Sequence, residues 1–178
     1  CRRDTVDFVV RHGPDAIRWL IDRGVPFSRE KIPNGKMEYH LTREGGHSQR
    51  RVIHAADATG HAVQTTLVER VKSHPNITLF EEHIAIDLIT DAKLNRPGKG
   101  CYGLHALDKN SGQVLTFSAQ QTVLASGGAG KVYLYTTNPD VATGDGLAMG
   151  WRAGCRVANM EFIQFHPTCL YHPHAKSF

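Results

Sequence analysis

Two glycine-rich turns constrain this chain more than any other feature of its sequence. Residues 122–130 read TVLASGGAG, so a short apolar run that we expect to be a strand leads directly into glycines. Residues 143–146 read TGDG and open a run that we expect to be a helix reaching Gly154. Glycine adopts backbone conformations that other residues avoid, and it lets the backbone pass close to a flat or anionic ligand. The two turns together predict two close approaches of the backbone to one ligand.

Each turn also has a plainer interpretation when it is taken singly. The small residues that end the first apolar run are Ala125, Ser126, Gly127 and Gly128. They could form only a strand-to-loop turn, and Asp145, between Gly144 and Gly146, could only cap the helix that follows. Asp145 could instead accept a hydrogen bond from a sugar hydroxyl. The order of the two turns along the chain favours the ligand-binding interpretation.

Helices are expected in the first part of the chain. Apolar residues recur at helical spacing as far as Gly24, but Gly13 and Pro14 interrupt them. The pattern therefore predicts two consecutive helices, the second beginning at Pro14 and ending at Gly24. A further helix is predicted over residues 60–73, because its apolar residues lie on one face and Pro75 closes the segment.

Short β-rich runs follow these helices. They are residues 77–81, 84–90, 101–108, 114–118 and 122–125, with one more strand-like run over 160–170. The middle three are expected to form an antiparallel meander. The first and last of the five are expected to be parallel strands, since a helix precedes one and glycines follow the other. The predicted fold class is α/β, with a parallel nucleotide-binding sheet interrupted by a small antiparallel meander.

A long stretch over residues 25–57 shows weak periodicity and many prolines and glycines, which is typical of a functional loop. Its centre, residues 41–51, reads LTREGGHSQRR. The arginines of this centre could form only a solvated basic edge. Glu44, however, stands beside two adjacent glycines, where the backbone can lie against a ligand while a carboxylate faces it. Glu44 is therefore a candidate ligand-binding residue.

Three histidines lie in residues 162–174, which read FIQFHPTCLYHPH. Their spacing matches no helical pair of metal ligands, and no cysteine or carboxylate completes a set, so a metal site is disfavoured. His166, which precedes Pro167, is better suited to donate a hydrogen bond to a substrate carboxylate. A core histidine under an aromatic strand is the alternative for His166 and the favoured interpretation for His172 and His174.

Composition indicates an ordinary globular protein. No apolar run approaches the roughly 18 residues needed to cross a bilayer, and the four cysteines form no CxxC pair. A net charge of +4 attracts a dinucleotide or a dicarboxylate as readily as a nucleic acid. We expect a soluble, cytoplasmic protein with free thiols and with neither a membrane nor a nucleic acid as partner, although binding of nucleic acid by the arginine-rich loop stays open as an alternative.

The motifs taken together resemble one superfamily of flavoproteins. LASGGAG, TGDG, AxxxRAG and QFHPT occur in the order found in the succinate dehydrogenase and fumarate reductase flavoproteins. Within that superfamily, LTREGGHSQRR, HAADATG, YTTNPDVATGDGLAMGWRAGCRVAN and FHPTCLYHP resemble the L-aspartate oxidase family almost throughout. The resemblance implies a glutathione-reductase-like FAD-binding domain over residues 1–158 and the beginning of a capping, substrate-binding domain over 159–178.

The resemblance also implies roles for single residues. Ile84 and Ala85 are expected to contact the adenosine of FAD, and residues 125–128 its phosphate and ribose region. Asp145 and its flanking glycines are expected near the flavin. Glu44 is expected to face the ammonium group of L-aspartate, and His166 to hold one of its carboxylates.

The implied activity is FAD-dependent oxidation of L-aspartate to iminoaspartate, with dioxygen or fumarate as acceptor. This reaction belongs to NAD (pyridine nucleotide) biosynthesis, where iminoaspartate passes to quinolinate synthase. A fumarate reductase or succinate dehydrogenase flavoprotein is the alternative. The family's strand-turn-helix unit at the amino end, whose GxGxxG turn cradles the pyrophosphate, is absent from this sequence. We therefore expect these 178 residues, as an internal fragment, to bind FAD poorly and to oxidise no aspartate by themselves.

Overall fold

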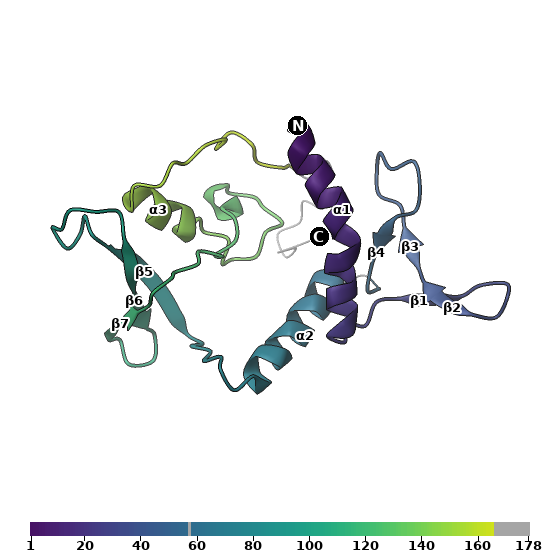
Figure 1. The fold of residues 1–178 in the computed structure, drawn as a ribbon, viewed down its shortest axis with the longest axis horizontal. Helices are drawn as coiled ribbons and strands as arrows, with labels where there is room; N and C mark the ends of the chain where they lie inside the picture. Colours follow the sequence, from purple (N-terminus) through teal and green to yellow (C-terminus); the bar gives the residue numbers. More distant parts are fainter. Residues whose placement is uncertain (57, 166–178) are drawn as a thin grey trace. The chain divides into compact units, whose positions relative to one another are not determined.

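The computed structural model describes residues 1–56 and 58–165 of this chain. The chain forms two compact units, one covering Cys1–Leu79 and the other beginning at Phe80. Figure 1 shows the helices and strands of both units along the chain. Each unit has its own helices, antiparallel strands and buried residues, and each is described by itself.

The first unit contains two helices and two short antiparallel hairpins. Its elements are α1 (Arg3–Asp22), β1 (Arg29–Lys31), β2 (Met37–Tyr39), β3 (Leu41–Thr42), β4 (Val52–Ile53) and α2 (Thr59–Ser73). Strand β1 pairs with β2, and β3 pairs with β4. The helix predicted over residues 60–73 is confirmed as α2. The long stretch between the helices is folded into the two hairpins and does not form one irregular loop.

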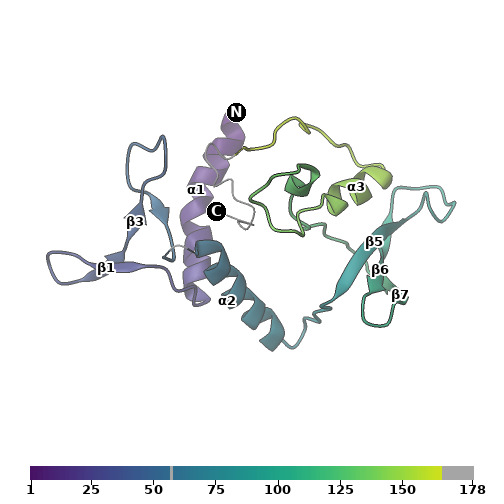
Figure 2. The ribbon, with the colours of Figure 1, turned by 180° about the vertical axis from the view of Figure 1, so that it is seen from behind.

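The small core of the first unit lies where the end of α1 meets the start of α2. Val25, Phe27 and Ala55 are buried there, and Leu20 of α1 and Val63 of α2 pack against them. Figures 1 and 2 both show α2 alongside the C-terminal part of α1. A polar contact supports the same arrangement, because the Arg70 guanidinium of α2 donates hydrogen bonds of 3.1 and 3.2 Å to the carbonyl that follows α1, at Arg23.

Helix α1 runs without a break through Pro14, so the prediction of two separate helices was wrong. A proline inside a helix removes one backbone hydrogen bond, here to the carbonyl four residues earlier at Val10. Val10 is exposed, so water can hydrate that carbonyl. Local ion pairs on the helix surface, such as Arg11 with Asp7 at 2.7 Å, support the continuous helix. The predicted end of the helix at Gly24 is confirmed, where the backbone turns into the left-handed region at φ +94°.

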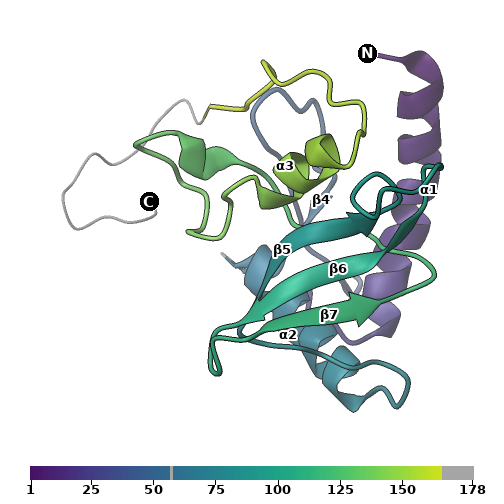
Figure 3. The ribbon, with the colours of Figure 1, turned by 90° about the vertical axis from the view of Figure 1, so that its left-hand side faces the viewer.

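The second unit is built on a three-stranded antiparallel sheet. Its strands are β5 (His83–Thr90), β6 (Cys101–Asp108) and β7 (Val114–Ser118), in the order β5-β6-β7. This arrangement confirms the predicted meander. After the sheet come a short 3-10 helix, η1 (Gly130–Val132), and helix α3 (Asp145–Arg152), which confirms the helix predicted after residues 143–146. Figure 3 shows α3 beside β5 at the edge of the sheet.

Buried residues join the sheet and the helix of this unit. Met149 of α3 is only 2% exposed, and Leu88 of β5 and Ala106 of β6 are also buried. The connection from β5 to β6 is closed by Asp91, whose carboxylate accepts hydrogen bonds from the Gly100 N–H at 2.7 Å and the Tyr102 hydroxyl at 2.9 Å. The bond to the Asp91 carboxylate raises the pKa of Tyr102, because it stabilises the protonated hydroxyl. The β5-β6 connection is thus held by one buried acid.

The parallel strands that the sequence predicts at residues 77–81 and 122–125 are not formed, and residues 160–165 form no strand either. Every strand pair among the described residues is antiparallel. A strand exists only with a hydrogen-bonding neighbour, and no described segment pairs with these runs. Their apolar side chains remain accessible, with Val123 84% exposed. The described fold is therefore mixed α and β with antiparallel sheets. The prediction of a parallel sheet is not met by the described residues.

A prediction concerns Gly103 in the middle strand of the sheet. Its φ is +132°, and a Cβ there would lie 1.8 Å from the carbonyl oxygen of Phe117 on β7. In the complete protein, Gly103→Ala should lower the free energy of unfolding by about 2–4 kcal/mol, since backbone strain and overlap add. Gly112→Ala is the control, because Gly112 also has a positive φ of +71° but a Cβ there would meet no described atom within 4 Å. That control should cost only about 1 kcal/mol, and equal losses in urea unfolding would contradict the account.

Candidate functional site

The two glycine turns predicted from the sequence lie against each other at the start of α3. Gly144, the residue before the helix, has the left-handed conformation at φ +80°. Its N–H donates a 3.1 Å hydrogen bond to the carbonyl of Gly128. A Cβ on Gly146 would lie 1.9 Å from the Ser126 hydroxyl oxygen, so that turn and helix approach too closely for any larger residue. The structure therefore brings residues 126–128 and 144–146 into one site.

One side of this site has room beside the backbone. A Cβ added at Gly127, where φ is +76°, or at Gly128 would meet no described atom within 4 Å. The first N–H groups of any α-helix have no partner within the helix, and they carry the positive end of its dipole. At α3 these groups belong to Asp145 and the residues after it. The backbone at this place suits a ligand with phosphate or other polar oxygens, so these residues fit the phosphate-bearing part of a dinucleotide.

The carboxylate of Asp145 is bonded to Thr143, the first residue of the same turn. Its Oδ2 accepts a 2.9 Å hydrogen bond from the hydroxyl of Thr143. Gly144, which occupies the capping position of α3, has no side chain to cap the helix. Both roles predicted for Asp145, capping the helix and accepting a hydrogen bond from a sugar hydroxyl, therefore stay predictions.

Ile84 and Ala85 lie in β5, in the same unit as the glycine turns. They pair with Leu107 and Ala106 of β6. After Ala85 the register shifts by one residue at a β-bulge. Ile84 is exposed on the sheet surface, which is where a bound group could reach it.

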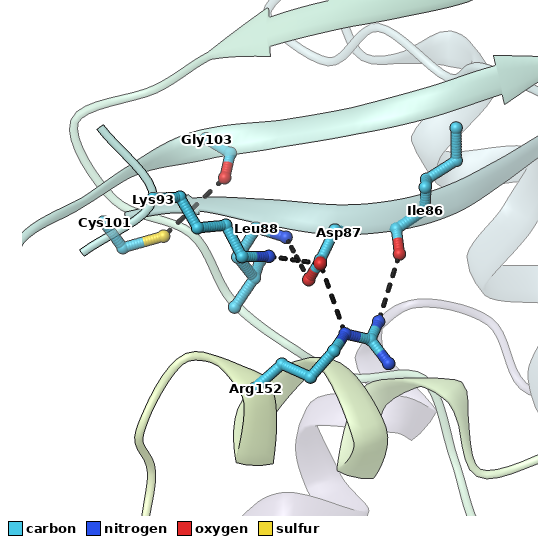
Figure 4. Close-up of polar contacts among 7 residues, drawn as sticks. All are labelled: Ile86, Asp87, Leu88, Lys93, Cys101, Gly103 and Arg152. Carbon is cyan, nitrogen blue, oxygen red and sulfur yellow. Dashed lines mark hydrogen bonds and ion pairs between the residues drawn. The ribbon is translucent and has the colours of Figure 1, made fainter. Parts of the chain in front are cut away.

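An ion-pair cluster beside this bulge was not predicted as functional. Arg152, the last residue of α3, donates through Nε to Asp87 Oδ2 at 3.2 Å, and Lys93 pairs with the same carboxylate (Figure 4). Partial burial alone would raise the pKa of Asp87, but the hydrogen bonds from Lys93 and Arg152 outweigh it and hold that pKa below its usual value. The stability that this cluster contributes is thus present above the ordinary carboxyl pKa and is lost as the pH falls through the lowered one. The signal in the sequence was the AxxxRAG pattern, which places an arginine at the end of the helix that the glycines begin.

Glu44 lies in the loop between β3 and β4, in the first unit. Its carbonyl accepts the N–H of His47 at 3.1 Å, and its own N–H donates to the His47 ring at 3.3 Å, so residues 44–47 form a tight turn. Gly46 in this turn has a φ of +79°. Among the described residues the Glu44 carboxylate has no hydrogen-bond or ion-pair partner, and it is exposed. Arg50 donates to the carbonyl of Leu41 at 3.2 Å, so at least this arginine braces the loop.

The histidines at the end of the chain, His166, His172 and His174, lie outside the described residues. Glu44 and the glycine turns belong to different units. The convergence of Glu44 and His166 on one ligand therefore stays a prediction. Within residues 1–56 and 58–165 no group of three or more His, Cys, Asp or Glu side chains could hold a metal ion. In that same part of the chain, every helix is too short or too polar to pass through a bilayer.

Comparison with known proteins identifies relatives of the chain. The family described as "FAD binding domain" matches residues 1–178. L-aspartate oxidase 1 of Ralstonia nicotianae is 67% identical over 178 residues, which are 100% of this chain and 33% of the relative. L-aspartate oxidase of Pseudomonas aeruginosa is 61% identical, over 100% of this chain and 34% of the relative. The chloroplastic L-aspartate oxidase of Arabidopsis thaliana is 47% identical, over 96% of this chain and 25% of the relative. The chain thus spans about a third of the length of the bacterial relatives.

Solved structures of two other proteins have a similar fold. A mutated FrdA of E. coli quinol fumarate reductase superposes with a TM-score of 0.76 at 35% identity, over 85% of this chain and 24% of that one. Sdh1 of Mycobacterium smegmatis in complex with UQ1 has a TM-score of 0.66 at 28% identity, over 80% of this chain and 24% of that one. The similarity covers most of the chain in both cases.

The close approach of Ser126 to Gly146 generates a prediction. In the complete protein, Gly146→Ala should lower the free energy of unfolding by about 1–3 kcal/mol, because the new methyl overlaps the Ser126 side chain. Ser126→Gly removes the overlapping atoms, so the double variant should regain most of that loss. Chemical unfolding of the two single variants and the double variant measures the coupling between the sites. Strictly additive losses would mean that the turn and the helix do not touch here.

Proposed function

We propose that the paired glycine turns of this chain hold FAD and that the chain forms part of an L-aspartate oxidase. The proposal starts from the finding that the chain belongs to the FAD binding domain family. The observation that carries the proposal is the direct contact of residues 126–128 with the start of α3. Such a contact places exposed backbone and a helix N-terminus side by side, which is what a phosphate-bearing cofactor needs. The identity to L-aspartate oxidases, 67% and 61% for two bacterial relatives, supports the choice of enzyme.

The cofactor contacts in this proposal come from three places in the second unit. Residues 125–128 face the phosphate and ribose region, because small side chains there leave room for the ligand. Gly144, Asp145 and Gly146 lie near the flavin, and Ile84 and Ala85 lie near the adenosine. FAD supplies, when it is bound, an acceptor for a hydride. The boundary between an FAD-binding part and a capping part, after residue 158, belongs to the same proposal.

The substrate contacts in this proposal are Glu44 and His166. The exposed Glu44 carboxylate lies in a glycine turn and has no partner among the residues that the structure describes. Such a carboxylate suits an ammonium group, so Glu44 orients L-aspartate by its nitrogen. His166 donates a hydrogen bond to a substrate carboxylate. Oxidation removes a hydride from the α-carbon and a proton from the nitrogen, and it leaves iminoaspartate. Dioxygen or fumarate is the final acceptor, and quinolinate synthase is the enzyme that receives iminoaspartate for NAD biosynthesis in the cytoplasm.

A fumarate reductase or succinate dehydrogenase flavoprotein is the second candidate. The observation in its favour is the structural similarity to FrdA of E. coli quinol fumarate reductase, at a TM-score of 0.76. A dicarboxylate without an ammonium group gives Glu44 no cation to pair with, and a carboxylate facing it would be repelled. Glu44 therefore favours an amino acid substrate over a plain dicarboxylate.

The test is Glu44→Gln in the complete, FAD-loaded protein, with L-aspartate oxidation and fumarate reduction measured on the same preparation. Loss of the charge should lower kcat/KM for L-aspartate by about 10- to 100-fold, the effect of a charge-assisted hydrogen bond. Fumarate reduction with an artificial electron donor should change by less than about threefold, because fumarate has no ammonium group.

Glu38→Gln is the matched control for this test, since Glu38 is an exposed acid of the same unit that lies in β2, outside the glycine turn. It should leave both activities unchanged. Equal losses of the two activities in Glu44→Gln would favour the dicarboxylate alternative. A wild-type preparation without a flavin absorbance band would overturn the proposal as a whole.

A further inference from the structure

Arg152 makes two hydrogen bonds from the last turn of α3 to strand β5. Its Nε donates to Asp87 Oδ2 at 3.2 Å, and its terminal NH2 nitrogen donates to the carbonyl of Ile86 at 3.2 Å. Figure 4 shows the guanidinium facing both acceptors. One side chain thus binds a carboxylate and a backbone carbonyl of consecutive residues, which a planar fork of N–H donors does well.

Ile86, whose carbonyl Arg152 reaches, lies at a bulge in β5, which is an edge strand of the sheet. Ala85 pairs with Ala106 and Asp87 with His105, so Ile86 has no partner across the ladder to β6. A bulged residue leaves backbone groups that the sheet does not satisfy. Arg152 supplies a donor for one of them. The bulge and the arginine are therefore complementary features of two segments far apart in the sequence.

Asp87 is held in place by other donors around it. Its Oδ1 accepts the N–H of Leu88 at 3.0 Å, and Lys93 pairs with Oδ2. Both cations therefore meet one carboxylate oxygen, while the other oxygen is bound to the backbone of β5. The acceptor that Arg152 uses is consequently fixed to the strand and does not swing freely with its side chain.

The opposite end of α3 is the candidate cofactor site. Gly144 is bonded to Gly128, and Gly146 lies against Ser126. With 8 residues, α3 is too short to be stable alone, so its position depends on contacts at its two ends and on buried Met149. Contacts at the Arg152 end therefore act on the placement of the N–H groups at the glycine end.

We propose that Arg152, bound to Asp87 and to the bulge at Ile86, is a positioning residue that sets where the glycine-bearing start of α3 meets FAD. This inference rests on the proposed function, namely that FAD binds at residues 126–128 and 144–146. Arg152 acts through the helix and does not touch the cofactor in this account. The AxxxRAG pattern thereby has a physical role, since the arginine must follow the glycines by the length of the helix.

A purely structural ion pair would behave differently in solution. The side chains of Arg152 and Asp87 are 41% and 23% exposed, and pairs this accessible contribute little to global stability. Removal of the pair should therefore leave the unfolding temperature of the protein without FAD almost unchanged. The effect should appear in FAD affinity, because binding depends on how well the site is arranged beforehand.

The experiment compares four variants of the complete protein, each stripped of flavin and titrated with FAD. They are Arg152→Gln, Arg152→Lys, Asp87→Asn and the double variant Arg152→Gln with Asp87→Asn. The control is Lys109→Gln, which breaks the exposed pair of Lys109 with Glu82, at the end of the same sheet where β5 begins. Flavin fluorescence gives the Kd, and thermal unfolding without FAD gives the global stability.

Arg152→Gln and Asp87→Asn should each raise the Kd for FAD about tenfold, the equivalent of one modest polar contact. Arg152→Lys should raise it about threefold, because an ammonium cannot serve both acceptors in the same geometry. The double variant should be no weaker than either single variant, since both remove the same interaction. Lys109→Gln should leave the Kd unchanged, and the unfolding temperature without FAD should stay within about 3 °C in every variant.

Unchanged FAD affinity in Arg152→Gln and Asp87→Asn would overturn the inference while the proposed function stands. A loss of affinity matched by a large fall in unfolding temperature would show a general structural role and would also overturn it. If Arg152→Gln fails to fold, the test uses Arg152→Lys and Asp87→Asn instead. The Kd for FAD of each is then compared with that of Lys109→Gln. A wild-type protein that takes up no FAD would instead contradict the proposed function, and the inference with it.

Discussion

The close contact between the glycine turn of residues 126–128 and the start of α3 is the constraint on which the candidate cofactor site depends. A side chain at Gly146 would occupy the space of the Ser126 hydroxyl, and a side chain at Gly144 would press on Ala129. The hydrogen bond from Gly144 to Gly128 closes the same contact through the backbone. Turn and helix can lie this close only because Gly144 and Gly146, at the start of the helix, carry no side chain.

The rest of the second unit supports this contact from outside. The antiparallel meander supplies a rigid strand, β5, and Met149 buries one face of α3. At the bulge in β5, the carbonyl of Ile86 accepts a hydrogen bond from Arg152 at the end of α3. The first unit has a separate task in the proposed function, because its glycine turn presents the Glu44 carboxylate, which has no partner within residues 1–56 and 58–165. In the proposed function, cofactor binding and substrate recognition would each use a glycine turn that exposes a functional group, in two different units.

Local patterns predicted the elements whose stability is local. The helix α2 ends where Pro75 forces it to, and β6 and β7 cover the same residues as the runs read from the sequence. The predictions of secondary structure were wrong where the surroundings of a segment decide its conformation. Residues 122–125 have the composition of a strand but no hydrogen-bonding partner among the described residues, and Pro14 stays within α1 because the carbonyl it leaves unpaired is exposed to water.

The sequence by itself determined the family, the glycine turns and the candidate residues, because these depend on residue types in a fixed order along the chain. Tertiary structure alone decided that Ser126 meets Gly146 and that Arg152 reaches the bulge at Ile86, since both contacts join segments far apart in the sequence. No periodicity or composition encodes where a bulge falls, because that depends on the register between two strands. The physical reason is that side-chain spacing is a local property, whereas the distance between two segments is set by how the whole unit packs.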